Sequence, residues 1–397
     1  MSGRVAIFGG RRWELAPGET SLSFDATRRE VRRHRDGCSE IVGDDIWTVL
    51  GEQLAGGATA IGYLGYACRP DLPALSGGDR PGMPDAVLLL THRPGRAVSS
   101  AEATRRRPAP PAPPEASEAS RPPAWYADAF AAVQEALHAG ETYETNLTYR
   151  IEVASTADPE EVFGRLCATS PAPYAGYLGH DVDGARVWLT GSSPERFALI
   201  EDGWIQTKPI KGTTPRAADT TEDAANAALL LTDPKLRSEN LIVTDLLRND
   251  LAICCAAGTV TVPRLMAVES YASVHQLVTT VHGRLSPGVT PTAAVRALFP
   301  PGSMTGAPKL RTMELIGRVE PGPRGPYAGV FGTLSADAAD LGVVIRTAVT
   351  AGDGRWQVGT GGGITVASGL EGEWAETWWK AERVLAALAA GEDVPVC

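Results

Sequence analysis

The sequence predicts an α+β fold in which mixed or antiparallel sheets pack with helices as a layered α/β sandwich. Two observations predict it. Strand-like and helix-like segments are mixed along the chain without regular alternation, and a two-residue turn signal joins two of the strand-like segments. A strict alternation of strand and helix would instead favour a doubly wound parallel sheet.

A proline-rich segment divides the chain. Residues 104–123 contain seven prolines among Ala, Ser and Glu, which predicts an extended linker without packed structure. This linker separates an N-terminal lobe, residues 1–103, from a larger C-terminal lobe, residues 124–393. The sequence contains no internal repeat, so neither lobe is predicted to be a repeat array.

The N-terminal lobe has short runs of strand character and one helical stretch. Residues 21–26 and 86–93 predict strands, and residues 44–57 predict a helix. These segments contain few residues suited to catalysis, so the candidate chemistry lies in the C-terminal lobe.

The C-terminal lobe opens with a helix over residues 126–140, where apolar residues recur at helical spacing until Gly140 ends it. Alternation predicts a strand over residues 146–155, and a helix is expected over residues 160–169. The later elements follow from length, composition and spacing. They are helix 233–258, strand 270–285, a helix, glycine-rich loop and helix over 290–320, strands 328–336 and 341–350, a glycine turn over 359–369 and helix 372–391.

Asp202-Gly203, between FALI and WIQT, is a strong signal for a two-residue hairpin turn. A turn centred there brings Glu195 and Lys211 to the same open end of one hairpin, roughly 5 Å apart across the strands. Two prolines disturb regular pleating at that end, so the face that each side chain takes stays open. The hairpin therefore predicts that an acid and an amine are neighbours.

Lys211 lies in TKPIKGTTPR, where a proline stiffens the approach and a glycine follows. Most lysines in such a segment are solvated loop residues. The alternative is an amine held close to a reactive group, and the rest of the sequence has to decide between the two.

Composition narrows the partners and the compartment. The chain has 397 residues, is 43% hydrophobic and 21% charged, and carries a formal net charge of −10. An acidic surface argues against nucleic acid or an anionic membrane as the main partner. The six cysteines show no CxxC spacing, which favours reduced thiols. With no signal peptide or membrane span predicted, we expect the cytoplasm.

The last predicted helix places Glu373, Glu376 and Lys380 on one face. A solvated helix face often has this pattern. Two carboxylates one turn apart are also a partial site for Mg²⁺, which prefers oxygen ligands. Glu239 could add a third carboxylate, although an acid near a helix start is stabilised by the helix dipole without any metal.

Backbone and guanidinium groups offer sites for anions. The segments GTGGGI (359–364) and PGSMTGAPK (301–309) are predicted to be glycine-rich turns that could aim N–H groups at a carboxylate or phosphate. Neither fits a phosphate-loop pattern. Arg346 lies inside the apolar run LGVVIRTAV, where a guanidinium needs an anionic partner such as a ligand carboxylate.

Eight motifs of the C-terminal lobe resemble, in family order, the signatures of the chorismate-utilising enzymes. The match runs from about residue 124 to about residue 390, and it implies the fold of that family. The motifs are SPERF (193–197), PIKGT (209–213), ENLIVTDLLRNDL (239–251), FPPGSMTGAPK (299–309), RGPYAGVFGTLS (324–335), VVIRTA (343–348), GGGI (361–364) and EWAETWWKA (373–381). The N-terminal lobe resembles the N-terminal half of anthranilate synthase component I only loosely.

Within the family, the lysine of PIKGT separates two branches. Anthranilate synthases usually have alanine where Lys211 stands, whereas lysine is typical of aminodeoxychorismate synthase component I. The resemblance implies that Lys211 attacks ring carbon C2 of chorismate, that the C4 hydroxyl departs with Glu195 as general acid, and that ammonia adds at C4 and expels the lysine. The product would be 4-amino-4-deoxychorismate, a precursor of 4-aminobenzoate for folate or for a secondary metabolite such as an antibiotic.

The attack requires a neutral Lys211, and we expect desolvation to lower its pKa toward that state. A dry pocket would raise the pKa of Glu195 and keep it protonated as an acid. The resemblance also implies that Mg²⁺ on the substrate's ring carboxylate is held by Glu239, Glu373 and Glu376. The substrate-binding residues that it implies are His275, Thr305, Tyr327, Arg346, Lys380 and the N–H groups of Gly361, Gly362 and Gly363.

Isochorismate and salicylate synthases carry a water-activating lysine in the strand that corresponds to YETNLTYR. The matching position here is Glu144, which disfavours hydration at C2. The sequence has no glutaminase signature GxCxGxQ, so ammonia is expected from a separate glutamine amidotransferase subunit.

Two alternatives remain beside amination at C4. Anthranilate synthase component I would place nitrogen at C2 and eliminate pyruvate. A non-catalytic chorismate-binding subunit would lack an acid, a metal ligand or the nucleophile, but every such position is filled. The chain also departs from its relatives, because no clear match to a tryptophan pocket is present and GGGITVASGLEGEW replaces an aspartate-containing stretch.

Overall fold

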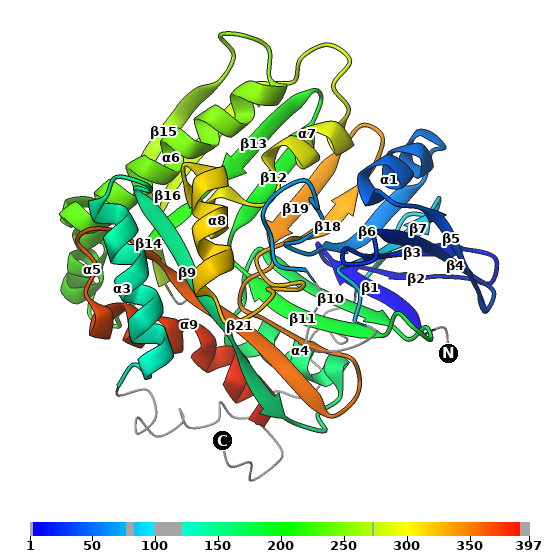
Figure 1. Cartoon of the computed structure of the whole chain (residues 1–397), viewed down its shortest axis with the longest axis horizontal. Helices are drawn as coiled ribbons and strands as arrows, with labels where there is room; N and C mark the ends of the chain where they lie inside the picture. The colour runs from blue at the N-terminus through cyan, green and yellow to red at the C-terminus, as the bar shows by residue number, and fades with distance from the viewer. Residues whose placement is uncertain (1–2, 77–82, 99–120, 272–273, 390–397) are drawn as a thin grey trace.

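A computed structural model describes residues 3–76, 83–98, 121–271 and 274–389 of the chain (Figure 1). Residues 104–120 of the predicted linker and residues 390–393 of the predicted C-terminal lobe lie outside these ranges. The order of the elements agrees with the predicted α+β class, because helices and antiparallel strands are mixed along the chain.

The helices begin where capping residues satisfy the first free backbone N–H groups. In five of them a side-chain oxygen of Asp45, Asp158, Asp219, Asp233 or Thr290 accepts such a bond. The described helices are α1 (Ile46–Ala55), α3 (Ala124–His138), α4 (Pro159–Thr169), α5 (Thr220–Thr232), α6 (Pro234–Cys254), α7 (Pro291–Leu298), η1 (Gly302–Met304), α8 (Lys309–Val319) and α9 (Leu370–Ala389).

The strands form two sheets, and every recorded pairing is antiparallel. The nine-stranded sheet runs in the order β17 (Gly306–Ala307), β9 (Glu144–Ala154), β21 (Arg355–Ile364), β20 (Thr347–Thr350), β11 (Val187–Ser193), β10 (Tyr174–His180), β1 (Arg4–Phe8), β2 (Arg11–Glu14) and β8 (Arg96–Ala97).

The second sheet has twelve strands. Eleven of them run in the order β14 (Ile210–Pro215), β16 (Val274–Arg284), β13 (Trp204–Lys208), β12 (Arg196–Glu201), β19 (Ala339–Val343), β18 (Val330–Leu334), β6 (Thr59–Leu64), β7 (Ala86–Thr91), β3 (Thr20–Asp25), β4 (Glu30–Arg35) and β5 (Cys38–Gly43). The twelfth, β15 (Thr261–Ser270), pairs with β16.

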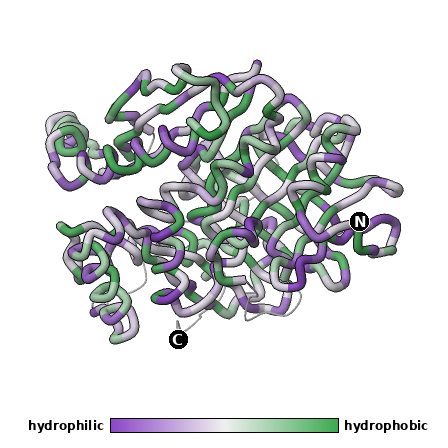
Figure 2. The backbone as a smooth tube through the Cα atoms, turned by 45° about the horizontal axis from the view of Figure 1, so that its top comes forward, coloured by the Kyte–Doolittle hydropathy of each residue, from purple (hydrophilic) through white to green (hydrophobic). Residues whose placement is uncertain are grey.

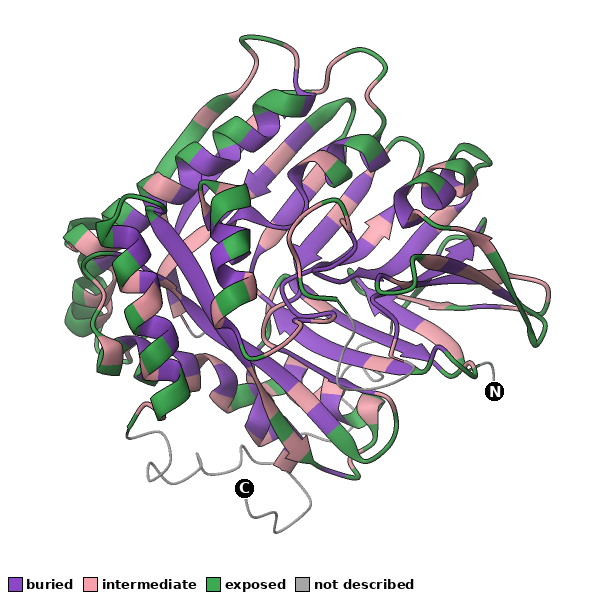
Figure 3. Ribbon diagram, in the orientation of Figure 1, coloured by how far each residue is buried: buried purple, intermediate pink, exposed green. Residues whose placement is uncertain are grey.

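The two sheets pack face to face through one apolar core. Phe8 of β1 contacts Phe331 of β18 edge to face at 5.5 Å between ring centroids, and Tyr63 and Leu178 are buried in the same cluster. Helices cover the outer faces, with α4 and α9 against the nine-stranded sheet and α6 against β16. Figure 3 shows the resulting pattern, in which the central strands are mostly buried, whereas the edge strand β15 and the outer side of the helices are exposed. This arrangement is a sandwich of sheets and helices.

Both sheets contain strands from before and after the proline-rich segment. β1 pairs with β10 over five residues, and β6 pairs with β18 over five residues. The candidate chemistry of the later residues is therefore mounted on sheets that the N-terminal residues complete.

The predicted hairpin is confirmed. Glu201 of β12 pairs with Trp204 of β13, and the two residues between them have positive φ values, 51° at Asp202 and 74° at Gly203. Positive φ at both central positions matches the twist of the flanking strands. The expected helices are likewise confirmed at α1, α3, α4, α6, α7, α8 and α9, whereas α5 has no counterpart among the predicted segments.

The prediction of one strand over residues 341–350 is wrong. The segment splits into β19, which belongs to the twelve-stranded sheet, and β20, which belongs to the nine-stranded sheet. Arg346 lies at the crossing with a φ of 50° instead of inside a strand. A continuous apolar run predicts burial on both faces but cannot show that the chain changes sheet.

The prediction of a glycine turn over residues 359–369 is also wrong in its first half. Gly359 to Gly363 belong to strand β21 and pair with β9. Glycine is needed there because of close approach: a Cβ on Gly359 would lie 2.1 Å from the ring of Tyr327. Strand glycines of this kind mark places where another group approaches the backbone.

Among the described helices, none combines the length and the apolar character needed to cross a bilayer. Hydrophilic and hydrophobic residues are interspersed along the backbone (Figure 2).

Candidate active site

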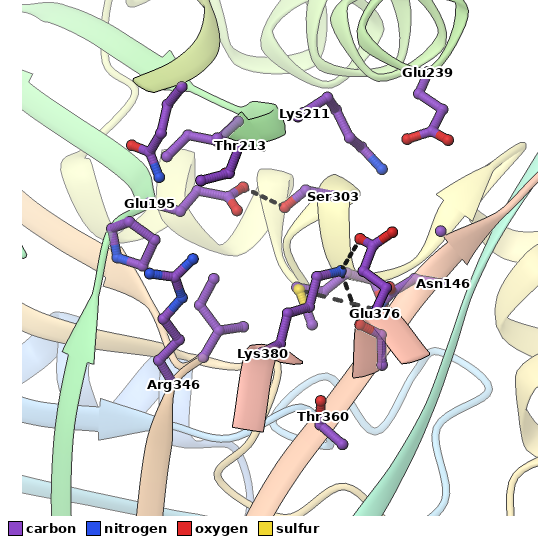
Figure 4. A pocket seen from close by; sticks show the side chains of 18 of the residues that line it. Asn146, Glu195, Lys211, Thr213, Glu239, Ser303, Arg346, Thr360, Glu376 and Lys380 are labelled. Atoms are coloured by element: carbon purple, nitrogen blue, oxygen red, sulfur yellow. Dashed lines mark hydrogen bonds and ion pairs between the residues drawn. The ribbon is translucent and has the colours of Figure 1, made fainter. Parts of the chain in front are cut away.

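A cavity of about 420 Å³ lies where the edges of the two sheets and helices α6 and α9 come together. Figure 4 shows Lys211 and Glu239 extending into it from one side and Lys380 and Glu376 from the other. Nine of the predicted site residues line it, namely Glu195, Lys211, Glu239, Tyr327, Arg346, Gly361, Gly363, Glu376 and Lys380. The structure therefore brings together residues that are spread over most of the C-terminal lobe.

Lys211 reaches the cavity because strand β14 is irregular at this point. The register of β14 against β16 shifts between Ile210 and Thr213, and Gly212 has a φ of 87°. Such a bulge redirects a side chain that regular pleating would send elsewhere. The side chain of Lys211 is 11% exposed, and its Nζ forms a hydrogen-bonded ion pair with Oε1 of Glu144 on β9. Lys211 is thus a largely buried amine and not a solvated loop lysine.

The charge of Lys211 differs from the expected state. Burial lowers its pKa, but the carboxylates of Glu144 and Glu239 outweigh burial and raise the pKa above the usual range. The expectation that desolvation leaves this amine neutral is therefore wrong for the ligand-free cavity. An attack by Lys211 requires a group that removes its proton.

Glu195 precedes strand β12 and is 7% exposed. Ser303 of η1 donates a hydrogen bond to its Oε1 at 2.5 Å (Figure 4). Burial raises the pKa of Glu195 to about 7, although Ser303, Lys211 and Lys380 act in the opposite direction. The rise agrees in direction with the expected effect of a dry pocket, and a carboxyl with a pKa near 7 is partly protonated at neutral pH. Its role as an acid stays a prediction.

Helices α6 and α9 contribute an acidic wall. Nζ of Lys235 lies 2.6 Å from Glu373 and 3.7 Å from Glu239, so one lysine bridges carboxylates of the two helices. Glu376 pairs with Lys380 at 2.8 Å. Glu373 is buried beside the cavity and is absent from its lining.

These carboxylates are the type of ligand that a cation binds, but in the ligand-free cavity they do not lie close enough together to hold one. Burial raises the pKa of Glu239 to about 7, and the nearby charges of Glu144 and Glu373 add to the effect. Crowded carboxylates of this kind are stabilised by a hard cation, which takes oxygen ligands. Among the described residues, however, no three His, Cys, Asp or Glu side chains converge closely enough to hold a metal by themselves.

The opposite wall is cationic. The guanidinium of Arg346 makes no recorded hydrogen bond or ion pair with another described residue, and burial together with nearby Arg383 lowers its pKa. Nζ of Lys380 donates to the carbonyl of Gly361 at 3.0 Å. A largely desolvated guanidinium without an anionic partner favours an anionic ligand.

Strand β21 can offer backbone donors to such a ligand. Gly359 to Gly363 pair with β9 along one edge, while β20 pairs only with Trp356 to Val358 on the other. Within the described residues, the second edge of the glycine stretch has no strand partner. Alternate N–H groups along this edge are therefore free to bind an anion.

Three predicted substrate-binding residues do not line the cavity. His275 bonds Ser270 at 2.7 Å and Asp223 at 3.0 Å, and its neighbour Gln276 lines the cavity instead, because adjacent strand residues face opposite ways. Thr305 is fully buried and donates to the carbonyl of Gly302. Gly362 lies on the side of β21 that faces Glu373.

Lys235 and Ser303 line the cavity but are not predicted as site residues from the sequence. Lys235 could have been found, because it lies one helical turn before Glu239 on the same face of α6. Ser303 lies in the glycine-rich segment 301–309, but nothing there indicates contact with Glu195. The pairing of Glu144 with Lys211 joins residues 67 positions apart and leaves no local signal.

A two-sheet α+β fold that encloses an acid with a raised pKa, a largely buried amine and a guanidinium without a recorded partner among the described residues indicates an enzyme acting on a small anion. Comparison with known proteins makes the class specific. The chain belongs to the chorismate binding enzymes, since the model of that family matches residues 49–386.

The relatives fall in two branches. Aminodeoxychorismate synthase of Streptomyces pristinaespiralis is 42% identical over 83% of this chain and 50% of its own length, and component 1 of the Escherichia coli enzyme is 41% identical over 66% and 57%. Anthranilate synthase component 1 of Streptomyces coelicolor is 34% identical over 94% and 83%. The chain thus spans about half the length of the aminodeoxychorismate synthases that it matches.

Solved structures agree on the fold. Anthranilate synthase component I from Streptococcus pneumoniae superposes with a TM-score of 0.75 at 24% identity, covering 96% of this chain and 92% of the other. A 2,3-dihydroxybenzoate-specific isochorismate synthase from Bacillus anthracis gives a TM-score of 0.73 at 20% identity, covering 98% and 97%. At these identities the likeness establishes the architecture alone.

Proposed function

We propose that the chain aminates chorismate at C4, giving 4-amino-4-deoxychorismate with the enolpyruvyl group retained. Lys211 forms a transient bond to C2, Glu195 protonates the departing C4 hydroxyl, and ammonia then adds at C4 and releases the lysine. The observation that carries the proposal is a largely buried lysine and a protonatable glutamate lining one cavity. Covalent catalysis needs a nucleophile beside an acid in this way.

The cationic wall supports a dicarboxylate substrate. Arg346, Lys380, Tyr327 and the free backbone edge of the glycine stretch of β21 would hold its carboxylates. No anionic partner of Arg346 is recorded in the part of the chain that the structure describes, so a bound carboxylate would compensate its charge. Bound water would be displaced by the substrate, which strengthens each of these contacts.

Magnesium belongs to the proposal as well. Glu239 and Glu376 face the cavity and Glu373 lies beside it, so these residues would hold Mg²⁺ together with the ring carboxylate of the substrate. Mg²⁺ usually takes one or two protein carboxylates and keeps the rest of its shell for waters and substrate oxygens. When bound, the ion would neutralise charge on the substrate carboxylate.

The nitrogen source is proposed to be a separate glutamine amidotransferase subunit. Three relatives are named as component 1 of an aminodeoxychorismate synthase, a name that implies a second component. The pathway beyond the product would lead to 4-aminobenzoate, for folate or for a secondary metabolite, and we propose a cytoplasmic location for this reaction.

The test is product identification. The protein is incubated with chorismate, Mg²⁺ and ammonium, and the products are separated by mass spectrometry while anthranilate fluorescence is followed. We expect 4-amino-4-deoxychorismate, and we expect Lys211→Ala to retain chorismate binding while losing amination at C4. Full-rate turnover by Lys211→Ala to the same product would exclude Lys211 as the nucleophile.

The second candidate is anthranilate synthase component I. It is favoured by the Streptomyces coelicolor relative, of which the chain covers 83%. This activity would place nitrogen at C2 and eliminate pyruvate, so strong anthranilate formation without an added lyase would replace the first proposal with the second.

A further inference from the structure

Glu144 lies at the start of strand β9, behind the nucleophile proposed above. Its side chain is 3% exposed, and its Oε1 accepts a hydrogen bond from Nζ of Lys211. Glu144 does not line the cavity, whereas Lys211 does, so the amine stands between the carboxylate and the substrate space. The pair is therefore placed to pass a proton away from the substrate side.

The neighbouring strand is shaped around this contact. Gly363 of β21 lies beside both groups, and a Cβ at that position would come within 2.5 Å of Glu144 Oε1 and 2.9 Å of Lys211 Nζ. Any larger residue would push the two groups apart. The glycine thus keeps the carboxylate and the amine in direct contact.

The hydrogen bonding of Glu144 differs from that of a structural carboxylate. Its Oε2 is buried and has no hydrogen-bond partner among the described residues. By contrast, both oxygens of the buried Glu320 carboxylate accept hydrogen bonds. Thr148 and Arg324 donate to Oε1, and Arg324 also donates to Oε2. Buried acids that serve the fold are normally satisfied in this second way. The free Oε2 leaves Glu144 with an oxygen that can bind a proton without breaking a second hydrogen bond.

We infer that Glu144 is a further catalytic residue, which takes the proton of Lys211 as the amine attacks chorismate and returns it when the product has formed. The inference rests on the proposed function. Lys211 is held as a cation by its ion pair, and only a neutral amine can attack. Glu144 would be the base that removes this proton.

The proton balance closes over one cycle. A proton moves from the Lys211 ammonium to the Glu144 carboxylate, the Nζ–C2 bond forms, and the C4–O bond breaks as Glu195 gives its proton to the departing hydroxyl, which leaves as water. Ammonia then bonds to C4 and the Nζ–C2 bond breaks, leaving a neutral amine. The new C4 ammonium returns a proton to Glu195, and Glu144 returns its proton to Lys211.

The other charged groups near Lys211 are less suited to this role. Glu195 is already assigned as the acid, and it accepts a hydrogen bond from Ser303. Glu239 lies on α6. Glu376 lies on α9 and pairs with Lys380. Of these carboxylates, Glu144 is the one with a recorded hydrogen bond to Nζ within the described residues.

Three variants test the inference in the full chain. Glu144→Gln keeps the shape but cannot accept the proton, and Glu144→Asp keeps a carboxylate at a longer distance. Glu269→Gln is the matched control, because Glu269 also pairs with a lysine, Lys208 at 2.7 Å, and neither residue lines the cavity. Each variant is assayed for kcat, KM and product with chorismate, Mg²⁺ and ammonium between pH 6 and 9, and its melting temperature is recorded.

We expect Glu144→Gln to lower kcat by about 100-fold or more while KM changes by less than about threefold, as for the loss of a general base. Its kcat should then rise by about tenfold per pH unit, because solvent must remove the proton. The kcat of Glu144→Asp should be at least about tenfold higher than that of Glu144→Gln, and its pH profile should match the wild type. Glu269→Gln should match the wild type.

The outcomes separate two failures. In the first case, the wild type makes 4-amino-4-deoxychorismate, and Glu144→Gln has an unchanged pH profile and an equal or higher kcat. Glu144 then only restrains the Lys211 cation, so the inference fails while the proposed function stands. A loss that appears in KM or in melting temperature alone, or that Glu144→Asp does not relieve, likewise overturns it. If the wild type forms no such product, both proposals fall together.

Discussion

The guanidinium of Arg324 binds both carboxylate oxygens of Glu320 in the interior of the protein, with both side chains 1% exposed. The same guanidinium donates to the carbonyls of Met304 and Asn146. Met304 adjoins Ser303, which bonds the acid Glu195, and Asn146 lies on the strand that carries Glu144. One buried ion pair therefore ties the acid side of the cavity to the lysine side.

Glu320→Gln should destabilise the protein strongly. The change leaves the Arg324 charge buried without its counter-ion, which costs about 3–5 kcal/mol in the free energy of unfolding. Urea unfolding followed by far-ultraviolet circular dichroism measures the loss. As a control, Arg311→Gln removes a surface pair with Glu141 and should leave the unfolding midpoint unchanged. Equal midpoints for wild type and Glu320→Gln would show that the buried pair carries no net stability.

Glu195→Gln should stabilise the protein at alkaline pH. The folded-state pKa of Glu195 is raised to about 7 by burial, whereas the unfolded value is 4.5. Between these two values the folded chain holds a proton that the unfolded chain has lost, so stability falls as pH rises through this window. Relative to the wild type, Glu195→Gln should gain about 1–3 kcal/mol at pH 8 and nothing below pH 4.5.

Urea unfolding of both proteins at pH 4, 6 and 8 measures the difference. The exposed change Glu371→Gln is the control, and it should show no such pH-dependent gain. A constant difference between Glu195→Gln and the wild type over the whole range would mean that the carboxyl has the same pKa in the folded and the unfolded state.

The sequence predicts the individual helices, strands and turns better than it predicts which of them contact each other. The turn at Asp202-Gly203 is local chemistry and is predicted correctly. Glu195 and Lys211, which lie just beyond the two ends of that hairpin, both line the cavity. The crossing at Arg346 depends on which sheet each half of an apolar run joins, and no local pattern encodes that choice. The contact of Glu144 with Lys211 is likewise decided by β9 and β14 meeting from two different sheets.

Gly363→Ala should disable the site without unfolding the protein. The new Cβ would overlap Oε1 of Glu144 and Nζ of Lys211, the ends of two side chains that can shift by a few tenths of an ångström or more. We expect a loss of about 1–3 kcal/mol in stability and a fall in kcat of about 100-fold. Gly317→Ala in α8, where a Cβ meets nothing within 4 Å, is the control and should retain full activity. Normal turnover by Gly363→Ala would show that the contact is not needed.

Removal of carboxylates from the acidic wall should weaken the response to Mg²⁺. Glu239 and Glu373 come from α6 and α9, and Lys235 bridges them in the ligand-free cavity. Mg²⁺ is usually held by only one or two protein carboxylates, so the loss of a single carboxylate weakens its binding. Glu239→Gln and Glu373→Gln should each raise the Mg²⁺ concentration needed for half-maximal activity by at least about tenfold.

The measurement is a Mg²⁺ titration of activity at fixed chorismate, together with calorimetric Mg²⁺ binding in the presence of chorismate. EDTA should abolish turnover in the wild type, and excess Mg²⁺ should restore it. Glu371→Gln, on the exposed side of the same helix as Glu373, should titrate like the wild type. Identical Mg²⁺ titrations for all four proteins would place the cation elsewhere, because a carboxylate that binds the ion cannot be removed without changing the concentration at which it binds.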